Sequence, residues 1–272
     1  MKSYKEIIIG PVKEEEVDLF TGLLSDLDYY GFEQEEETLK AYIEEDKFDF
    51  VELSALAKEF NFRFSSSELE DQNWNRLWES NFDPVEVDGF VGLRADFHPS
   101  FGNKVRYELI ITPKMSFGTG HHATTYMMIQ QMQNLSWRDA DVLDFGTGTG
   151  VLAILAAKLG AKNIVAIDND EWSIDNTREN IQANQVSKID LRLASSLPET
   201  EPVDIILANI NRNVIIENFK TIVALLKNGG NLVLSGLLVE DEPTILHIAQ
   251  QYALRHENTL NRLNWISMRF SK

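Results

Sequence analysis

Glycines at every second position join an apolar strand-like run to an apolar helix-like run, and carboxylates stand on both sides of them. Residues 141–150 read D-V-L-D-F-G-T-G-T-G, with glycines at Gly146, Gly148 and Gly150. Glycine lets another group lie against bare backbone, and the helix that follows offers free N–H groups. Asp168 stands 22 residues after the first glycine, where a carboxylate accepts hydrogen bonds from a ribose. The pattern predicts a site for a cofactor that contains a nucleoside.

The spacing of the glycines and the acid before them indicate which cofactor. A dinucleotide fingerprint is G-x-G-x-x-G, whose third glycine helps to admit a pyrophosphate. This chain has G-x-G-x-G, and Asp144 stands two residues before the first glycine. A carboxylate at this position repels a pyrophosphate and favours a cationic ligand. S-adenosylmethionine has a ribose, a sulfonium and an ammonium and no phosphate, so we expect it here; a purely structural turn is the alternative.

A polar loop precedes this turn. Residues 117–125 read F-G-T-G-H-H-A-T-T, which places many hydrogen-bonding groups just before a predicted helix. The threonines also suit a helix cap. Adjacent histidine side chains diverge and no second ligand spacing accompanies them, so we expect no metal site. We identify no general base: His121 and His122 are candidates by position only, and structural roles suit them equally.

Alternating strand and helix patterns surround these motifs. Beyond the central turn, helices are predicted at 171–184, 211–226 and 240–252, and strands at 163–167, 190–193, 203–207 and 231–234. Before it, a strand at 107–111 and a helix at 126–135 are predicted, and the chain closes with strand-like runs at 253–259 and 264–270. A terminal hairpin puts an antiparallel strand into a parallel sheet. We therefore expect a doubly wound α/β fold with a mostly parallel, seven-stranded Rossmann-like sheet of the methyltransferase type.

The first part of the chain has a different pattern. Residues 4–66 follow the order β-α-β-β-α-β, which predicts a smaller α+β ferredoxin-like domain. We expect this domain at 1–66, a connector at 67–104 and the cofactor domain at 105–272. In the connector, Trp74 and Trp78 lie four residues apart, which favours a hydrophobic anchor between domains over a substrate platform.

Charge is distributed unevenly along the 272 residues. Residues 1–80 hold 21 acidic and 8 basic residues, whereas residues 81–272 hold 22 and 17, within a net charge of −18. A strongly negative segment attracts basic partners and repels nucleic acid, although a surface tuned for solubility has the same composition. The chain has no cysteine and no apolar run near the ~20 residues of a membrane span. We expect a cytoplasmic monomer without membrane or direct nucleic-acid contacts.

Four motifs in one order resemble the PrmA-type methyltransferase of ribosomal protein L-eleven (L11). They are F-G-T-G-H-H-A-T-T, V-L-D-F-G-T-G-T-G-V-L-A-I, A-I-D-N-D and L-A-N-I, which begin at residues 117, 142, 166 and 207. The match covers most of residues 70–272. The resemblance implies a class I S-adenosylmethionine-dependent enzyme that methylates lysine and/or N-terminal amino groups of that ribosomal protein. It also implies that the small N-terminal domain, which is acidic here, holds the basic substrate.

The resemblance carries cofactor contacts over to individual positions. Asp168 is implied to bind the ribose hydroxyls, Gly146 to bring backbone close to the methionine part, and Thr125 to close over the cofactor. Asn209 is implied to lie at the methyl-transfer pocket, where it is a candidate for positioning the substrate amine. With the acid and the second glycine of the turn, the expected cofactor-binding residues are Thr125, Asp144, Gly146, Gly148, Asp168 and Asn209.

The sequence departs from the family pattern at several positions, and it leaves other functions possible. His121 and Ala123 stand where the family loop usually has threonine and proline, and Thr147 stands where cysteine is common. One rival is a class I methyltransferase of another basic protein, a small molecule or nucleic acid; enzymes of the last kind usually carry N-P-P-Y or D-P-P-Y where this chain has A-N-I-N at 208–211. A nicotinamide oxidoreductase and a non-catalytic ribosome-associated binding protein are the others.

Overall fold

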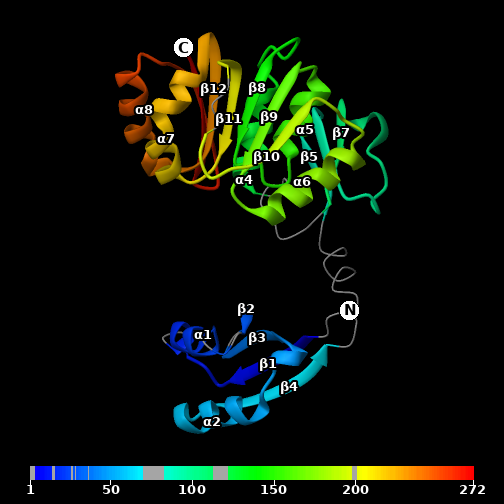
Figure 1. The fold of residues 1–272 in the computed structure, drawn as a ribbon, viewed down its shortest axis with the longest axis vertical. Helices are drawn as coiled ribbons and strands as arrows, with labels where there is room; N and C mark the ends of the chain where they lie inside the picture. The colour runs from blue at the N-terminus through cyan, green and yellow to red at the C-terminus, as the bar shows by residue number, and fades with distance from the viewer. Residues whose placement is uncertain are drawn as a thin grey trace. The chain divides into compact units, whose positions relative to one another are not determined.

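The chain divides into two compact units, residues 1–81 and 82–272, in the computed structural model (Figure 1). The structure describes residues 4–13, 16–25, 27, 29–35, 37–69, 83–112, 122–197 and 201–272. Each unit has a hydrophobic core of its own. The two units are therefore described separately.

The first unit is a four-stranded antiparallel sheet with two helices. Its elements are β1 (Tyr4–Gly10), α1 (Val17–Ser25), β2 (Tyr30–Glu35), β3 (Thr38–Glu44), α2 (Phe50–Phe60) and β4 (Arg63–Leu69). The strand order is β2-β3-β1-β4. Alternate residues of β1 and β3, such as Ile7, Ile9 and Leu39, are buried with Leu53 of α2. The expected ferredoxin-like fold is confirmed.

The second unit is built on a seven-stranded sheet. Its helices are α4 (Ala123–Met132), α5 (Val151–Leu159), α6 (Glu171–Ala183), α7 (Arg212–Leu225) and α8 (Glu242–Gln251). Its strands are β8 (Asp141–Phe145), β9 (Asn163–Asp168), β10 (Ile189–Leu193), β11 (Val203–Asn209), β12 (Leu226–Leu238), β13 (Arg255–Arg262) and β14 (Trp265–Ser271). Their order is β10-β9-β8-β11-β12-β14-β13, and β14 pairs antiparallel to both neighbours. This confirms the predicted parallel sheet with a terminal antiparallel hairpin.

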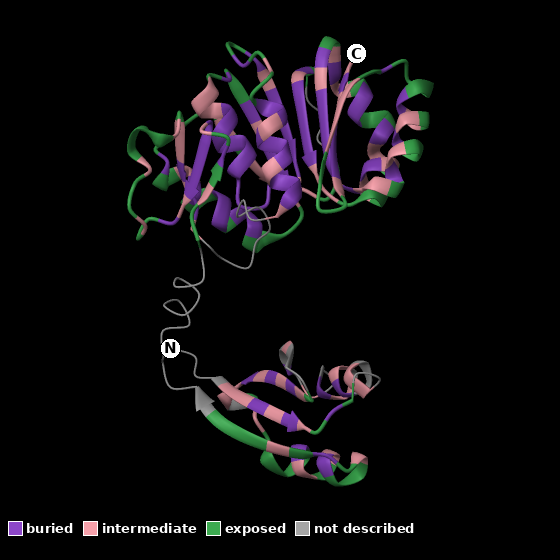
Figure 2. Ribbon diagram, turned by 180° about the vertical axis from the view of Figure 1, so that it is seen from behind, coloured by how far each residue is buried: buried purple, intermediate pink, exposed green. Residues whose placement is uncertain are grey.

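The sheet is buried on both faces because its strands alternate between two cores. Val142 of β8 and Leu207 of β11 pack on one face with residues of α4 and α5, whereas Leu143 and Ala208 pack on the other with residues of α7 and α8. Figure 2 shows the central strands almost entirely buried, with exposed residues on the outer helix surfaces. Two covered faces explain why these strands read as apolar runs in the sequence.

A smaller three-stranded sheet precedes α4 in the second unit. It contains β5 (Val85–Val87), β6 (Val91–Arg94) and β7 (Tyr107–Ile110), with β6 and β7 parallel. Its buried side chains join the core that includes α5. Residues 83–104, which we expected in the connector, therefore pack with the second unit. This unit begins at Phe82, whereas we expected the cofactor domain to begin at residue 105. Strands of three or four residues between turns resemble a linker in sequence. The roles of the domains stay a prediction, and Trp74 and Trp78 lie outside the described residues.

Two element boundaries differ from the prediction for local reasons. Helix α4 begins at Ala123 because His122 caps it and accepts a hydrogen bond from the Thr124 N–H. Strand β12 includes the Gly229–Gly230 pair, since Gly229 N–H donates to the carbonyl of Lys272 next to the end of β14. Within the described residues, no helix combines the length and apolar character that a membrane crossing requires.

Candidate active site

The predicted site residues lie at one edge of the seven-stranded sheet. Strands β8, β9 and β11 are parallel neighbours, so their carboxyl ends meet at the same edge (Figure 1). The strand order reverses between β8 and β11. In a doubly wound sheet, ligands bind in the crevice outside the carboxyl ends at such a reversal. Asp168 ends β9, Asn209 ends β11, and the glycine turn follows β8.

The glycine turn has a backbone that other residues do not readily adopt. Gly146 has φ +76°, and its N–H and that of Thr147 both donate to the Ile167 carbonyl at 2.9 Å. A Cβ on Gly146 would overlap the side chain of Ile210, which follows Asn209. A side chain at position 146 is therefore excluded both by backbone conformation and by space. Bare backbone lies between the strand end and the N-terminus of α5.

Asp168 is tied to this turn by its carboxylate. One oxygen, Oδ2, accepts the Gly148 N–H at 2.8 Å, and Oδ1 accepts the Asp170 N–H at 3.1 Å. A carboxylate has about four acceptor positions, so two backbone bonds leave room for two further donors. This arrangement fits the two hydroxyls of a ribose. Asp170 in turn caps α6 through the N–H groups of Trp172 and Ser173.

Asp144 is fully buried below the turn. Its Oδ2 accepts a hydrogen bond of 2.7 Å from the Thr147 hydroxyl, and its Oδ1 has no hydrogen-bond partner in the described part of the chain. Burial raises the pKa of Asp144 to about 7, while the Thr147 hydroxyl and the nearby Ala153 N–H oppose this shift and the charge of Asp168 adds to it. An unfilled acceptor on a buried carboxyl fits a cationic ligand group, as the ammonium of S-adenosylmethionine would supply.

Asn209 and Thr125 meet although 84 positions separate them. The Asn209 amide Nδ2 donates to Thr125 Oγ1 at 3.3 Å. Its Oδ1 is buried and has no hydrogen-bond partner among the described residues. The next residue is fixed because Ile210 N–H donates to the Ser235 carbonyl at 3.2 Å. The Asn209 amide therefore has its nitrogen held by Thr125 and a buried oxygen without a partner among the described residues.

Gly236 and Trp265 belong to this region but were not predicted from the sequence. Gly236 has φ +82°, and a Cβ there would lie 2.7 Å from the Ile210 carbonyl carbon and closer still to its oxygen. It sits where the pairing of β12 with β14 shifts register. Trp265 makes an edge-to-face contact with His122, with ring centroids 4.8 Å apart. A lone glycine in an apolar strand is the only sequence signal for the first; the second has none.

The structure describes one of the two histidines of the polar loop. His122 caps α4, its Nδ1 lies 2.8 Å from Thr124 Oγ1, and burial lowers its pKa. His121 and the rest of 117–121 lie outside the described residues. Where the chain is described, no cluster of three or more His, Cys, Asp or Glu side chains is arranged to hold a metal ion.

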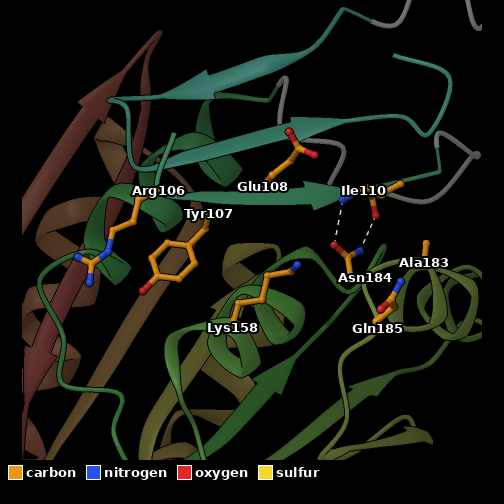
Figure 3. A pocket seen from close by; sticks show the side chains of 8 residues that line it. All are labelled: Arg106, Tyr107, Glu108, Ile110, Lys158, Ala183, Asn184 and Gln185. Carbon is orange, nitrogen blue, oxygen red and sulfur yellow. Dashed lines mark hydrogen bonds between the residues drawn. The ribbon is translucent and has the colours of Figure 1, made fainter. Parts of the chain in front are cut away.

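A cavity of about 560 Å³ lies elsewhere in the second unit (Figure 3). It is formed by β7 and by the C-terminal ends of α5 and α6, so it faces away from the glycine turn at the other end of α5. Its lining includes none of the predicted site residues; the lining residues are Arg106, Tyr107, Glu108, Ile110, Lys158, Ala183, Asn184 and Gln185.

The seven-stranded sheet with its terminal antiparallel hairpin is the fold of a class I S-adenosylmethionine-dependent methyltransferase. Residues 12–272 match the family model described as ribosomal protein L11 methyltransferase (PrmA). The chain therefore belongs to the ribosomal protein L11 methyltransferase family, and it is a protein methyltransferase. This confirms the resemblance, the enzyme class and the fold that the sequence predicted.

Individual relatives agree with the family match. A ribosomal protein L11 methyltransferase of Porphyromonas gingivalis is 40% identical over 262 residues, covering 93% of this chain and 90% of that protein. One of Chlorobaculum tepidum is 36% identical over 265 residues, covering 92% and 90%. The crystal structure of a ribosomal protein L11 methylase from Lactobacillus delbrueckii subsp. bulgaricus superposes with a TM-score of 0.63 at 25% identity. It covers 70% of this chain and 98% of that one.

Proposed function

We propose that this enzyme transfers methyl groups from S-adenosylmethionine to amino groups of ribosomal protein L11, and that the crevice at the carboxyl edge is its active site. The family match supports the substrate, since the relatives are named for it. The observation that carries the site is the open acceptor of Asn209, which is buried and held from its other end by Thr125.

The residues of the turn have distinct roles in holding the cofactor. Asp168 accepts the ribose hydroxyls while its backbone bonds to Gly148 and Asp170 keep it in place. Gly146 leaves space for a ligand against the main chain. The negative charge of Asp144 favours the cationic methionine part. When bound, S-adenosylmethionine supplies an electrophilic methyl group on a sulfonium.

The acceptor amine must reach the crevice without its extra proton. A lysine ammonium has an unperturbed pKa of about 10.4, so most of it is protonated near neutral pH. Moving it out of water into a crevice lowers that pKa. The Asn209 Oδ1 then accepts an amine N–H and directs the nitrogen lone pair. Holding the amine in line supplies much of the acceleration. We assign no general base.

The acidic first unit is proposed to hold the protein substrate. Residues 1–80 carry a net charge of −13, against −5 for the rest of the chain. Such a field attracts a basic ribosomal protein and raises its association rate. A ribosomal substrate also implies action in the cytoplasm. The monomeric state and the lack of direct nucleic-acid binding stay predictions.

Mass spectrometry of L11 after incubation with the enzyme and S-adenosylmethionine tests the proposal. We expect mass gains in steps of one methyl group. Asp168→Ala should weaken S-adenosylmethionine binding by roughly tenfold or more, because it removes hydrogen bonds to a charged group. Asn209→Ala should abolish most transfer while L11 still binds. If wild-type enzyme binds S-adenosylmethionine but L11 gains no mass, the proposed substrate is wrong.

A further inference from the structure

The cavity on the far side of the second unit is a groove along an open strand edge. We call it the β7 groove, defined by Arg106, Tyr107, Glu108, Lys158, Asn184 and Gln185 (Figure 3). Its volume of about 560 Å³ lies within the range of about 300–1,000 Å³ typical of ligand sites. It plays no part in the proposed methyl transfer. The glycine turn lies at the N-terminus of α5, whereas Lys158 stands in its last turn.

Strand β7 offers every second peptide group to this groove. On its inner side, Tyr107 N–H donates to the Phe90 carbonyl at 2.9 Å and Ile111 N–H donates to the Arg94 carbonyl at 2.8 Å. Peptide groups of adjacent residues in a strand point to opposite sides. The N–H and C=O of Glu108 and Ile110 therefore point away from β6, toward the groove.

The side chain of Asn184 pairs with the outward N–H and C=O of Ile110, as a neighbouring strand would. The Ile110 N–H donates to Asn184 Oδ1 at 3.0 Å, and Asn184 Nδ2 donates to the Ile110 carbonyl at 2.6 Å (Figure 3). One helical turn earlier, Asn180 Oδ1 accepts the Thr112 N–H at 2.9 Å. The N–H and C=O of Glu108, next along the same edge, make no hydrogen bond within the described residues. An edge of this kind is a template for strand addition.

Two cations among the lining residues, Arg106 and Lys158, give the groove a positive charge. Lys158 is half-buried and has no hydrogen-bond or ion-pair partner in the described part of the chain; burial lowers its pKa, and the charge of Glu108 opposes that shift. The Arg106 guanidinium lies over the Tyr107 ring at 5.3 Å. These cations are open to a ligand in a chain whose net charge is −18.

The one carboxylate of the groove lining is already neutralised. Glu108 Oε1 accepts from Arg94 Nε at 2.9 Å. Its Oε2 accepts from the Ser100 hydroxyl at 2.7 Å and the Phe101 N–H at 2.6 Å. In Figure 3 its side chain points away from Lys158. With Glu108 paired to Arg94, the groove keeps the positive charges of Arg106 and Lys158, of which the second is partly offset by the charge of Glu108.

We propose that the β7 groove binds an extended peptide segment of another protein, with an acidic side chain, by strand addition. The peptide backbone makes two hydrogen bonds to Glu108 and so continues the pairing that Asn184 provides at Ile110. Its carboxylate approaches Lys158 and Arg106. Backbone bonds supply affinity in this mode and the side chain supplies specificity. Because the groove and the glycine turn lie at opposite ends of α5, a bound peptide leaves the active site open.

Nuclear magnetic resonance of the full-length protein tests this directly. The probe is acetyl-Thr-Val-Glu-Val-Thr-amide, added to protein labelled with ¹⁵N. We expect the Glu108 amide signal to move and its hydrogen exchange to slow on titration. Glu108→Pro removes the outward N–H of the backbone at an edge where proline is tolerated, together with the side-chain bonds to Arg94, Ser100 and Phe101. Its matched control, Glu108→Ala, loses the same charge and the same side-chain bonds and keeps the N–H. We expect roughly fivefold to tenfold weaker binding for the proline variant than for the alanine variant, the effect of one backbone hydrogen bond.

The charge of the groove is tested by a second pair. Lys158→Gln should weaken the glutamate peptide several-fold and leave a peptide with glutamine in that place unchanged. Thermal unfolding and S-adenosylmethionine binding of each variant report whether the fold is intact. The proposal is overturned if Glu108→Pro and Glu108→Ala bind alike or if the shifts map elsewhere. It also fails if inorganic phosphate moves the signals of Arg106 while the peptide leaves Glu108 unmoved, since the groove is then a small-anion site.

Discussion

The proposed role of Asp144 in cofactor binding links that binding to the stability of the fold. Its pKa is about 7 in the folded chain against 3.8 without perturbation. Between pH 4 and 7 the unfolded chain thus releases a proton that the folded chain keeps, so this group lowers stability as pH rises and its effect is constant above pH 7. Asp144→Asn removes the effect. We expect the variant without cofactor to melt above wild type at pH 8 and close to it at pH 4, measured by calorimetry.

The same carboxyl should make S-adenosylmethionine affinity depend on pH. Ionised Asp144 attracts the cationic ligand and the protonated form does not, so affinity should rise with pH up to about 7, by no more than about tenfold per pH unit. Titration calorimetry at pH 6 and pH 8 measures this. Asp144→Asn should bind more weakly with a flatter profile. Equal profiles for the two proteins would place the ligand charge away from Asp144.

We propose that Thr125 acts on methyl transfer through Asn209. Its Oγ1 accepts the Asn209 amide at 3.3 Å and is fully buried. Thr125→Val keeps the shape and removes the acceptor, leaving the amide free to turn. We expect kcat to fall roughly tenfold, the value of about one hydrogen bond in the transition state, and Thr125→Ser to restore most of it. If the serine variant is as slow as the valine variant, packing rather than the hydroxyl sets the rate.

Strand β12 packs against Ile210, the residue after Asn209, at Gly236. Both Gly236 and Gly229 of this strand have positive φ, but a Cβ at 229 meets nothing within 4 Å whereas a Cβ at 236 overlaps Ile210. Gly229→Ala therefore isolates the backbone strain of about 1–2 kcal/mol. Gly236→Ala adds displacement of Ile210 and with it Asn209. We expect a small drop in melting temperature for the first variant, and for the second a larger drop with a kcat loss exceeding about tenfold. Similar kcat values for the two variants would contradict this role.

Elements with strong local signals could be predicted, and pairings between distant segments could not. The run β8, glycine turn and α5 was predicted because strand period, glycine spacing and helix period all occur within 141–159. By contrast, nothing in the sequence brings Thr125 to Asn209, because that contact depends on α4 packing against β11. The resemblance supplied both residues without their hydrogen bond. Gly236 was missed because its role is to leave space for the backbone of Ile210, which follows the end of β11 and is distant in the sequence.

At the scale of the molecule, the two units have separate cores. The core of residues 1–81 shares no residue with the two cores of residues 82–272. A fragment of residues 82–272 should therefore fold alone and bind S-adenosylmethionine with nearly unchanged affinity. If the first unit holds the substrate, KM for L11 should rise by about tenfold or more in the fragment, since one set of contacts is lost. A fragment with unchanged KM would remove the substrate role from the first unit.

The negative charge of the first unit allows a test of whether L11 is recognised by electrostatic attraction or by uncharged contacts. Exposed charges interact over a Debye length of about 10 Å at 0.1 M salt and only ~3 Å at 1 M. With −13 on residues 1–80, KM for basic L11 should rise several-fold between 50 and 300 mM salt. Binding of S-adenosylmethionine should change little, because Asp144, the proposed partner of its cationic part, is buried. The fragment of residues 82–272 should show a shallower salt dependence. Equal slopes for the fragment and the full chain would mean that the acidic residues serve solubility and that substrate recognition rests on uncharged contacts.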